Sequence, residues 1–295
     1  MKETHKIRQY LQSKNLSGET IKNYLSAIDF YNDFLLQRGK TAENATKKDL
    51  LDYLNNPYRP VSKYKIVVSK QISNNTKQHI LGTLNHYYNY LLQAHGIENI
   101  TRLIKIRGVK RQHLRHLFTS EQLEQLCDAL YYEHKEKTSF DDPNLQQQKD
   151  YILLTLAVYQ GLTLGEIRRL EKDDFDFRKA TVNVHKSRKA NARILSLDAT
   201  QTGLLMLYFQ ESETANFVTS VNYVNSLHRQ LRKLCNTYEN LIQLRSSRIN
   251  IWIKTYGLRK AQYLAGHRYI SSTEAYLNND FESLQNDMDN FHPLQ

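Results

Sequence analysis

Apolar residues recur at intervals of three and four along several stretches of the first hundred residues. The clearest stretch follows Ser17, a residue suited to capping a helix, and ends at Gly39. Its apolar positions are Ile21, Tyr24, Leu25, Ile28, Tyr31, Phe34 and Leu35. This spacing puts the apolar side chains on one face of an α-helix. We therefore predict an amphipathic helix between Ser17 and Gly39.

Three further helices are predicted around it. A short helix opens the chain. Another runs from Thr46, with Asp49 at the third helical position as in a capping box, to the helix breaker Pro57. The fourth covers residues 74–96 and ends at a glycine. Because no single helix can bury its own apolar face, a small helical bundle is the expected arrangement.

The second half of the chain changes period once. A helix is expected to begin at Thr119, a loop to occupy 133–149, and an apolar helix to follow over 150–160. Over 175–197 apolar and polar residues alternate on both sides of a turn rich in Lys and Arg, which predicts β-strands. Helices resume after that. The fold class is therefore mainly α, with a small antiparallel sheet in the second domain.

Positive charge dominates the composition, with 41 Lys and Arg against 30 Asp and Glu, a net charge of +11. Residues 102–115 contain no acid, and their cations are Arg102, Lys105, Arg107, Lys110, Arg111 and Arg115. Such a segment is either a solvated linker or a surface that lies across phosphates. We place the domain boundary here, giving domains 1–111 and 112–295. A polyanionic partner is what this charge favours.

The sequence does not favour membrane insertion, secretion or metal binding. No apolar run reaches the length of about 18 residues that a membrane span needs, and the polar start lacks a signal-peptide core. Cys127 and Cys235 have neither disulfide nor metal-ligand spacing, and Cys127 is expected in the core. We expect a cytoplasmic protein with no membrane association and no metal or other cofactor.

Three segments carry candidate chemistry. One is 161–167, Gly-Leu-Thr-Leu-Gly-Glu-Ile, followed by the basic hairpin. The second contains Gln243-Leu-Arg245, and the third runs from Leu264-Ala-Gly-His267 through Ser-Ser-Thr to Tyr276, nine residues after the histidine. Together these segments resemble the tyrosine recombinase, or phage integrase, family. The resemblance extends over essentially the whole chain, because the N-terminal bundle is similar to the family's core-binding (SAM-like) domain.

The resemblance implies an activity and roles for individual residues. Tyr276 would attack a DNA phosphodiester and form a 3′-phosphotyrosyl link, which stores the bond energy so that rejoining needs neither ATP nor metal. Arg245 and His267 would stabilise the charge on the phosphate. Either Lys186 or Lys189, on the hairpin, would protonate the leaving oxygen. The resemblance also implies double-stranded DNA as the partner, with the protein acting on it as a homo- or hetero-oligomer.

Two positions depart from the family pattern. Thr163 stands where the family has its first arginine, and Ile242 where it has its earlier histidine. The spacing from Arg245 to His267 is also one residue shorter than expected. Thr163 and Glu166 match a helix capping box without any chemistry. Substitute cations are available nearby in Arg168, Arg169 and Arg248.

Three functions remain open on the sequence. The first is a site-specific recombinase or integrase of a mobile element. The second is a catalytically weakened or inactive DNA-binding relative that acts as a partner subunit or regulator, which the departures at Thr163 and Ile242 favour. The third is a helical scaffold for acidic proteins, which leaves the His267–Tyr276 motif unexplained. If Thr163 occupies the first arginine's place, Thr163→Arg is expected to raise weak cleavage about 10-fold.

The end of the chain carries one more pattern. Phe281, Leu284, Met288 and Phe291 form a short apolar stripe. The stripe is either part of the core or, as the resemblance implies, a segment that docks on a neighbouring protomer.

Overall fold

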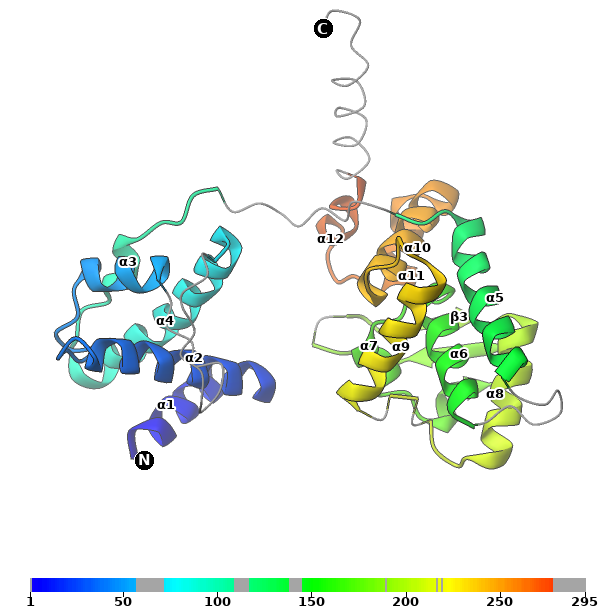
Figure 1. Cartoon of the computed structure of the whole chain (residues 1–295), viewed down its shortest axis with the longest axis horizontal. Helices are drawn as coiled ribbons and strands as arrows, with labels where there is room; N and C mark the ends of the chain where they lie inside the picture. Colours follow the sequence, from blue (N-terminus) through cyan, green and yellow to red (C-terminus); the bar gives the residue numbers. More distant parts are fainter. Residues whose placement is uncertain are drawn as a thin grey trace, which may run out of the picture. The chain divides into compact units, whose positions relative to one another are not determined.

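A computed structural model describes residues 2–56, 72–108, 117–137, 145–188, 190–215, 217–218 and 220–277. The chain forms two compact units, Met1–Gln112 and His113–Gln295 (Figure 1). The predicted breaker Pro57 and the apolar stripe after residue 280 lie outside the described residues. No helix in the described ranges is long and apolar enough to cross a membrane.

The N-terminal unit contains four α-helices and one 3₁₀-helix among its described residues. They are α1 (Lys2–Ser13), α2 (Gly18–Leu36), α3 (Lys47–Asn55), α4 (Asn74–His95) and η1 (Ile100–Leu103). The predicted caps are confirmed, because Ser17 accepts from the backbone of Thr20 and Thr46 forms a capping box with Asp49. α4 ends at Gly96, which adopts the left-handed conformation. α2 ends at Leu36, three residues before Gly39.

The core of this unit is rich in tyrosine. Tyr31, Tyr53 and Tyr88 are almost completely buried together with the apolar stripe of α2. A buried phenol needs a partner for its hydroxyl. The hydroxyls of Tyr31 and Tyr88 lie 2.9 Å apart, and Tyr88 also donates to the carbonyl of Ala42 at 3.3 Å. These bonds join α2, α4 and the α2–α3 loop into one body.

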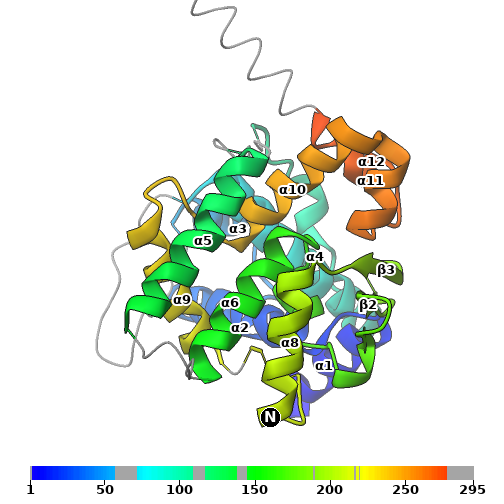
Figure 2. The same ribbon diagram turned by 90° about the vertical axis from the view of Figure 1, so that its right-hand side faces the viewer.

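The C-terminal unit is mainly helical with one small sheet. Its helices before and around the sheet are α5 (Ser120–Lys137), α6 (Leu145–Val158), α7 (Leu164–Ile167), the 3₁₀-helix η2 (Lys172–Asp174) and α8 (Ala199–Glu211). The later helices are α9 (Val221–Leu234), α10 (Leu241–Tyr256), α11 (Leu258–Ala265) and α12 (Ser271–Glu274). α6 is buried along most of its length and packs against α5, α8 and α10 (Figure 2).

Three short antiparallel strands form the sheet in the order β1 (Phe175–Asp176), β2 (Thr181–Val184) and β3 (Arg193–Ser196). Val182 pairs with both Phe175 and Leu195, and these three side chains lie in the core. The predicted strands over 175–197 are confirmed. Arg193 is buried on the same side of β3 as Leu195, and β3 lies beside α11 (Figure 2).

The predicted loop at 133–149 is wrong at both ends. α5 continues to Lys137, and α6 begins at Leu145 rather than near residue 150. Gln146 donates to Asp150 at 3.1 Å, so a polar side chain of the first turn of α6 is partnered within the helix. The polarity of this stretch suggested a loop, but Gln, Glu and Lys are good helix formers.

Candidate active site

Arg245 is held between two turns of the C-terminal unit. It lies on α10, and its Nη1 donates to the carbonyl of Gly161 while its Nη2 donates to the carbonyl of Ala265 at 2.8 Å. Gly161 has a φ of +57°, and a Cβ there would approach Trp252 to 3.0 Å. A glycine at position 161 therefore allows the chain to turn where its carbonyl meets the guanidinium. Two of the five N–H donors of Arg245 fix its position.

His267 and Tyr276 lie together at the next turn. The two rings stack with centroids 5.9 Å apart and planes 14° apart. Nδ1 of His267 is 2.9 Å from Oγ1 of Thr273, a fully buried residue between α11 and the tyrosine. The sequence motif includes Ser-Ser-Thr, but it does not indicate that Thr273 orients the ring of His267. Residues 267 and 276, nine apart in the sequence motif, therefore have their rings stacked on one another in the structure.

The histidine is electrically neutral at pH 7. Burial lowers the pKa of His267 to about 4, and the charges of Arg245 and Arg193 act in the same direction. Tyr276 packs against the small apolar cluster of α10 and α11 that includes Trp252. Tyr276 and Arg245 are also close enough to interact electrostatically. A guanidinium, a neutral imidazole and a phenol are therefore brought together.

Thr163 serves as a helix cap in the structure. Its side chain accepts from the backbone of Glu166 at 3.2 Å, and Oε2 of Glu166 accepts from the backbone N and from Oγ1 of Thr163, each at 2.9 Å. The capping box predicted for Thr163 and Glu166 is confirmed. The hydroxyl of Thr163 therefore makes its hydrogen bonds within the first turn of α7.

Arg193 is a site residue that the sequence reasoning missed. Its Nη1 lies 2.7 Å from Oε1 of Glu166, and its side chain is fully buried. Nη1 of Arg245 lies 3.7 Å from the other oxygen of the same carboxylate. The alternation Arg-Ile-Leu-Ser was a usable signal, because a charged residue in register with inward apolar positions of a strand must have a buried partner.

The β2–β3 hairpin contacts the turn that carries His267. Ala190 forms an isolated antiparallel bridge with His267, and the backbone of Asn191 donates to the carbonyl of Gly266 at 2.9 Å. Lys186 lies on this hairpin and is exposed. Lys189, the other predicted hairpin lysine, lies outside the described residues. The structure therefore brings the hairpin that carries Lys186 into contact with the His267 turn.

Four further residues considered from the sequence are Ile242, Arg168, Arg169 and Arg248. Ile242 lies on α10 and is 68% exposed. Arg168 and Arg169 are exposed after α7. Arg248 lies one turn after Arg245, where its Nε donates to the carbonyl of Val158 at 2.6 Å. Among the described residues, none of these four forms a hydrogen bond, ion pair or ring contact with His267 or Tyr276.

The basic segment of the N-terminal unit alternates in burial. Ile104 and Ile106 pack against the apolar core, while Lys105 and Arg107 between and after them are exposed. Arg102 is also exposed, although its Nη2 reaches Asn89 at 3.3 Å. Lys110, Arg111 and Arg115 lie outside the described residues. The described part of the segment therefore presents its cations to solvent from a fixed backbone.

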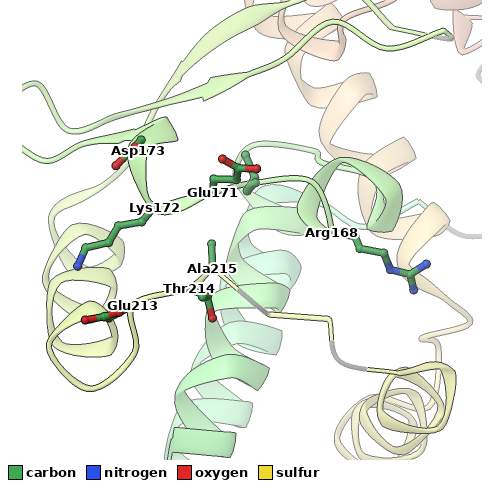
Figure 3. Close-up of a pocket in the computed structure, with 8 residues that line it drawn as sticks. Arg168, Glu171, Lys172, Asp173, Glu213, Thr214 and Ala215 are labelled. Atoms are coloured by element: carbon green, nitrogen blue, oxygen red, sulfur yellow. The ribbon is translucent and has the colours of Figure 1, made fainter.

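A cavity of about 470 Å³ lies elsewhere in the C-terminal unit (Figure 3). Its walls mix cations with carboxylates: Arg168, Glu171, Lys172, Asp173 and Glu213. None of the residues around His267 lines it. A cavity with this balance of charge does not suit a polyanion, and no group of His, Cys, Asp and Glu that could hold a metal occurs among the described residues.

Known proteins resemble this chain in sequence over nearly its whole length. Tyrosine recombinase XerC of Bacillus subtilis is 25% identical, over 97% of this chain and 94% of its own length. XerC of Oceanobacillus iheyensis is 23% identical over 91% and 88%. These relatives extend over both units of the chain.

Solved structures share the fold. XerH site-specific recombinase bound to palindromic difH substrate has a TM-score of 0.66 at 14% identity, covering 94% of this chain and 81% of that one. A lambda integrase dimer bound to a COC′ core site has a TM-score of 0.59 at 17% identity, covering 92% and 75%. The model of the phage integrase family matches residues 116–283. The chain therefore belongs to the phage integrase family of tyrosine recombinases.

Proposed function

We propose that this protein is a site-specific DNA recombinase or integrase of a mobile element, acting in the cytoplasm, with Tyr276 as its nucleophile. Family membership associates the chain with site-specific DNA recombination. The observation that carries the finer proposal is the contact of Tyr276 with His267 beside Arg245. Nothing in the packing of a helical bundle requires these three polar groups to meet.

The proposed chemistry is a transesterification. The hydroxyl of Tyr276 gives its proton to solvent, and its oxygen attacks the scissile phosphorus. The 3′-phosphotyrosyl bond forms as the bond from phosphorus to the 5′-oxygen breaks, and the 5′-oxygen leaves with a proton from Lys186 or Lys189. The free N–H groups of Arg245 and the imidazole of His267 donate to the non-bridging oxygens. Attack by the freed 5′-hydroxyl reverses the step. The bond energy is conserved, so neither ATP nor a metal enters the scheme.

The proposed DNA contact involves both units. The N-terminal unit (1–111) is proposed as the core-binding domain. The basic segment 102–115, which crosses the domain boundary, is proposed to contact phosphates through Arg102, Lys105, Arg107, Lys110, Arg111 and Arg115. Phosphate contacts of this kind fix position on the duplex without reading sequence. Lambda integrase, a structural neighbour, forms a dimer on its core site. We propose an oligomer on DNA here as well.

A second candidate is a DNA-binding relative with weak or absent cleavage, serving as partner subunit or regulator. Two observations favour it. Thr163 is engaged in a helix cap, and Ile242 offers no donor and points to solvent. Removing a single charge-stabilising donor typically reduces a rate by about 10²–10³.

A covalent-capture experiment separates the two. The wild-type protein is incubated with a pool of nicked duplexes of random core sequence, and DNA that stays attached after denaturation is sequenced. We expect adducts with wild type and with Tyr269→Phe, an exposed matched control, and none with Tyr276→Phe. Duplex affinity should be the same in all three. Binding without any adduct would support the second candidate, and an adduct in Tyr276→Phe would refute the choice of nucleophile.

A further inference from the structure

Arg193 carries a buried positive charge that the proposed mechanism does not use. Its Nη1 pairs with Glu166 at 2.7 Å, and the side chains are 0% and 3% exposed. Its Nε and Nη2 are enclosed and have no hydrogen-bond partner in the part of the chain that the structure describes. Buried polar groups are nearly always satisfied, so a guanidinium left in this state calls for an explanation.

One carboxylate lies between two arginines. Oε1 of Glu166 faces Arg193, while Oε2 accepts from Thr163 and lies 3.7 Å from Nη1 of Arg245. Burial raises the pKa of Glu166, but the hydrogen bond and charge of Arg193 outweigh this effect and lower it. Glu166 is therefore ionised, and Arg193 is its principal counter-ion.

The balance of charge follows from this arrangement. Glu166 contributes one negative charge, and Arg193 and Arg245 contribute two positive charges, so the group carries +1. Without Arg193 the net charge would be zero, and Arg245 would be the one cation within 4 Å of Glu166 among the residues that the structure describes. A guanidinium paired with a carboxylate attracts a phosphate far less than an uncompensated one.

The position of Arg193 links it to the same turn as His267. A Cβ on Gly266, whose φ is +70°, would lie 2.4 Å from Nη1 of Arg193, so the guanidinium lies directly on the glycine backbone. Gly266 also accepts a hydrogen bond from Asn191 on the hairpin. Arg193 thus contacts α7 through Glu166 and the His267 turn through Gly266.

We propose that Arg193 is a positioning residue of the cleavage site, which neutralises Glu166 and so leaves the charge of Arg245 available to the scissile phosphate. This inference rests on the proposed function. Arg193 acts through Glu166 and does not touch the DNA, because its side chain is fully enclosed. A direct contact of its Nε and Nη2 with the phosphate is the competing arrangement, and the two make opposite predictions for a double variant.

The decisive variants are Arg193→Met and the double variant Glu166→Gln/Arg193→Met. The first brings the net charge of the group to zero. The second restores +1, and Gln at position 166 still caps the helix. We expect Arg193→Met to slow adduct formation by about 10²-fold or more, and the double variant to recover to within about 10-fold of wild type. A folded double variant as slow as Arg193→Met would overturn the proposal in favour of direct contact.

Folding is checked by the fluorescence of Trp252, the single tryptophan, which lies on α10. Arg193→Met leaves Glu166 without its main counter-ion and is expected to be less stable than wild type. The double variant has no such unpaired charge. Its behaviour therefore keeps the test decisive even where the single variant folds poorly.

A second readout does not depend on cleavage. Arg245 from α10, Arg193 from β3 and Glu166 from α7 all act on His267, whose ring stacks on Tyr276. Nuclear magnetic resonance titration should find the pKa of His267 higher in Arg193→Met than in wild type, and near the wild-type value in the double variant. An unchanged pKa in Arg193→Met would refute the charge balance. If wild type forms no adduct, the proposed function fails while this titration still decides the role of Arg193.

Discussion

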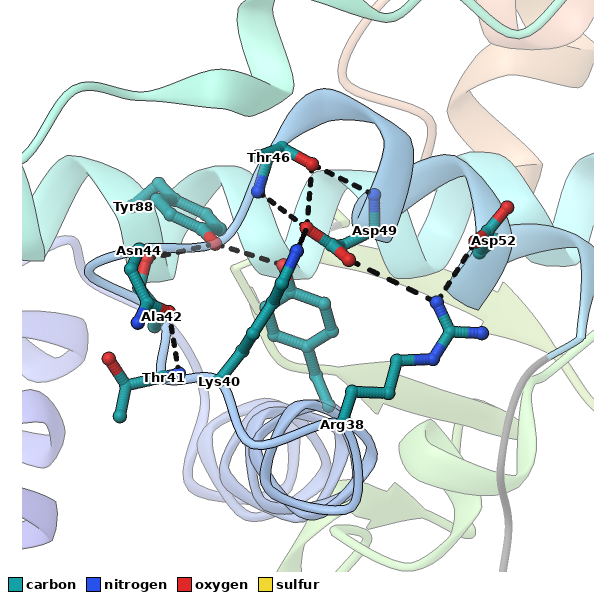
Figure 4. A network of polar contacts seen from close by, with 10 residues as sticks. Arg38, Lys40, Thr41, Ala42, Asn44, Thr46, Asp49, Asp52 and Tyr88 are labelled. Carbon is teal, nitrogen blue, oxygen red and sulfur yellow. Dashed lines mark hydrogen bonds and ion pairs between the residues drawn. The ribbon is translucent and has the colours of Figure 1, made fainter.

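The same local motif occurs once in each unit, with different surroundings. In the N-terminal unit Thr46 and Asp49 form a capping box at the start of α3, and Lys40 and Arg38 approach the carboxylate at 2.7 and 4.0 Å (Figure 4). In the C-terminal unit Thr163 and Glu166 form the equivalent box at the start of α7. There two arginines, from β3 and α10, approach the carboxylate.

The two boxes differ in how far their cations are exposed. The side chains of Arg38 and Lys40 are 40% and 34% exposed, and Arg38 also binds Asp52 at the surface. The side chains of Arg193 and Arg245 are 0% and 11% exposed. Water screens the first pair, whereas the second lies in a medium where charges act strongly on one another.

This difference in exposure distinguishes the two boxes: the one around Asp49 stabilises the fold, whereas the one around Glu166 belongs to the candidate active site. Burial raises the pKa of Asp49, but hydrogen bonds from Lys40 and Thr46 outweigh it and hold the pKa well below its ordinary value. The result is a firmly ionised carboxylate in the first turn of α3. Around Glu166 the same local geometry fixes two enclosed cations beside His267. Four predictions test the comparison, from the largest expected effect to the smallest.

Removing the carboxylate should affect the two units unequally. Glu166→Ala leaves two enclosed cations without their counter-ion, so we expect a loss of about 3–5 kcal/mol in the free energy of unfolding. Asp49→Ala removes part of a cap and partly exposed ion pairs, for about 1–2 kcal/mol. Urea unfolding followed by Trp252 fluorescence and by far-ultraviolet circular dichroism measures both. Equal losses would contradict the comparison.

Acid should act on the Asp49 and His267 sites in different pH ranges. The pKa of His267 is depressed from 6.5 to about 4, so its neutral form is favoured by folding. Its contribution is complete above pH 6.5 and is lost as the pH falls toward 4. Because His267 is partly exposed and water screens it, the contribution amounts to less than about 3 kcal/mol. The pKa of Asp49 is also depressed, but its contribution is lost only below about pH 4.

Melting temperatures from pH 3 to 8 measure this difference. His267→Gln, which keeps a polar group beside Thr273, should flatten the loss above pH 4, and Asp49→Asn should flatten only the loss below it. A wild-type loss between pH 6.5 and 4 that persists unchanged in His267→Gln would show that another group causes it.

Exposed cations should make DNA binding depend on salt. With contacts to about six phosphates, log K against log salt is expected to have a slope of about −5. Replacing Lys105 and Arg107 by Gln should reduce its magnitude by about 1.8 and weaken all duplexes alike. Lys179→Gln is the matched control, because Lys179 is exposed but lies 3.6 Å from Asp176. If the slope of log K against log salt were unchanged in the Lys105/Arg107 double variant, these two residues would not contact phosphates.

The helix caps Thr46 and Thr163 should contribute equally to the free energy of unfolding. Thr46→Ala and Thr163→Ala are each expected to lower stability by about 1 kcal/mol, because each removes one acceptor for a helix N-terminus. The sequence alone predicted that Thr163→Arg would raise cleavage about 10-fold. With Arg193 already neutralising Glu166, we expect the loss of the cap and a gain in adduct formation below about threefold. A 10-fold gain would show that the site lacks a cation.

Local patterns in the sequence predicted the helices, the caps and the sheet. Ser17, Thr46 and Thr163 cap helices as expected, because a cap is formed by residues three apart and needs no distant partner. The Arg245, His267 and Tyr276 motifs were recognisable by spacing. The polar stretch at 133–149 was misread, because composition alone does not exclude a helix.

Only the tertiary structure decided which charges meet. Arg193 is 27 residues from Glu166 and 52 from Arg245, and no local pattern relates such positions. The alternation of β3 indicated that Arg193 points inward, but its partner came from α7 and its backbone contact from Gly266. The sequence by itself determined the elements and the family motif. The packing of β3 against α7 and the His267 turn determined the charge at the site, because Coulomb interactions depend on distance and burial rather than on order along the chain.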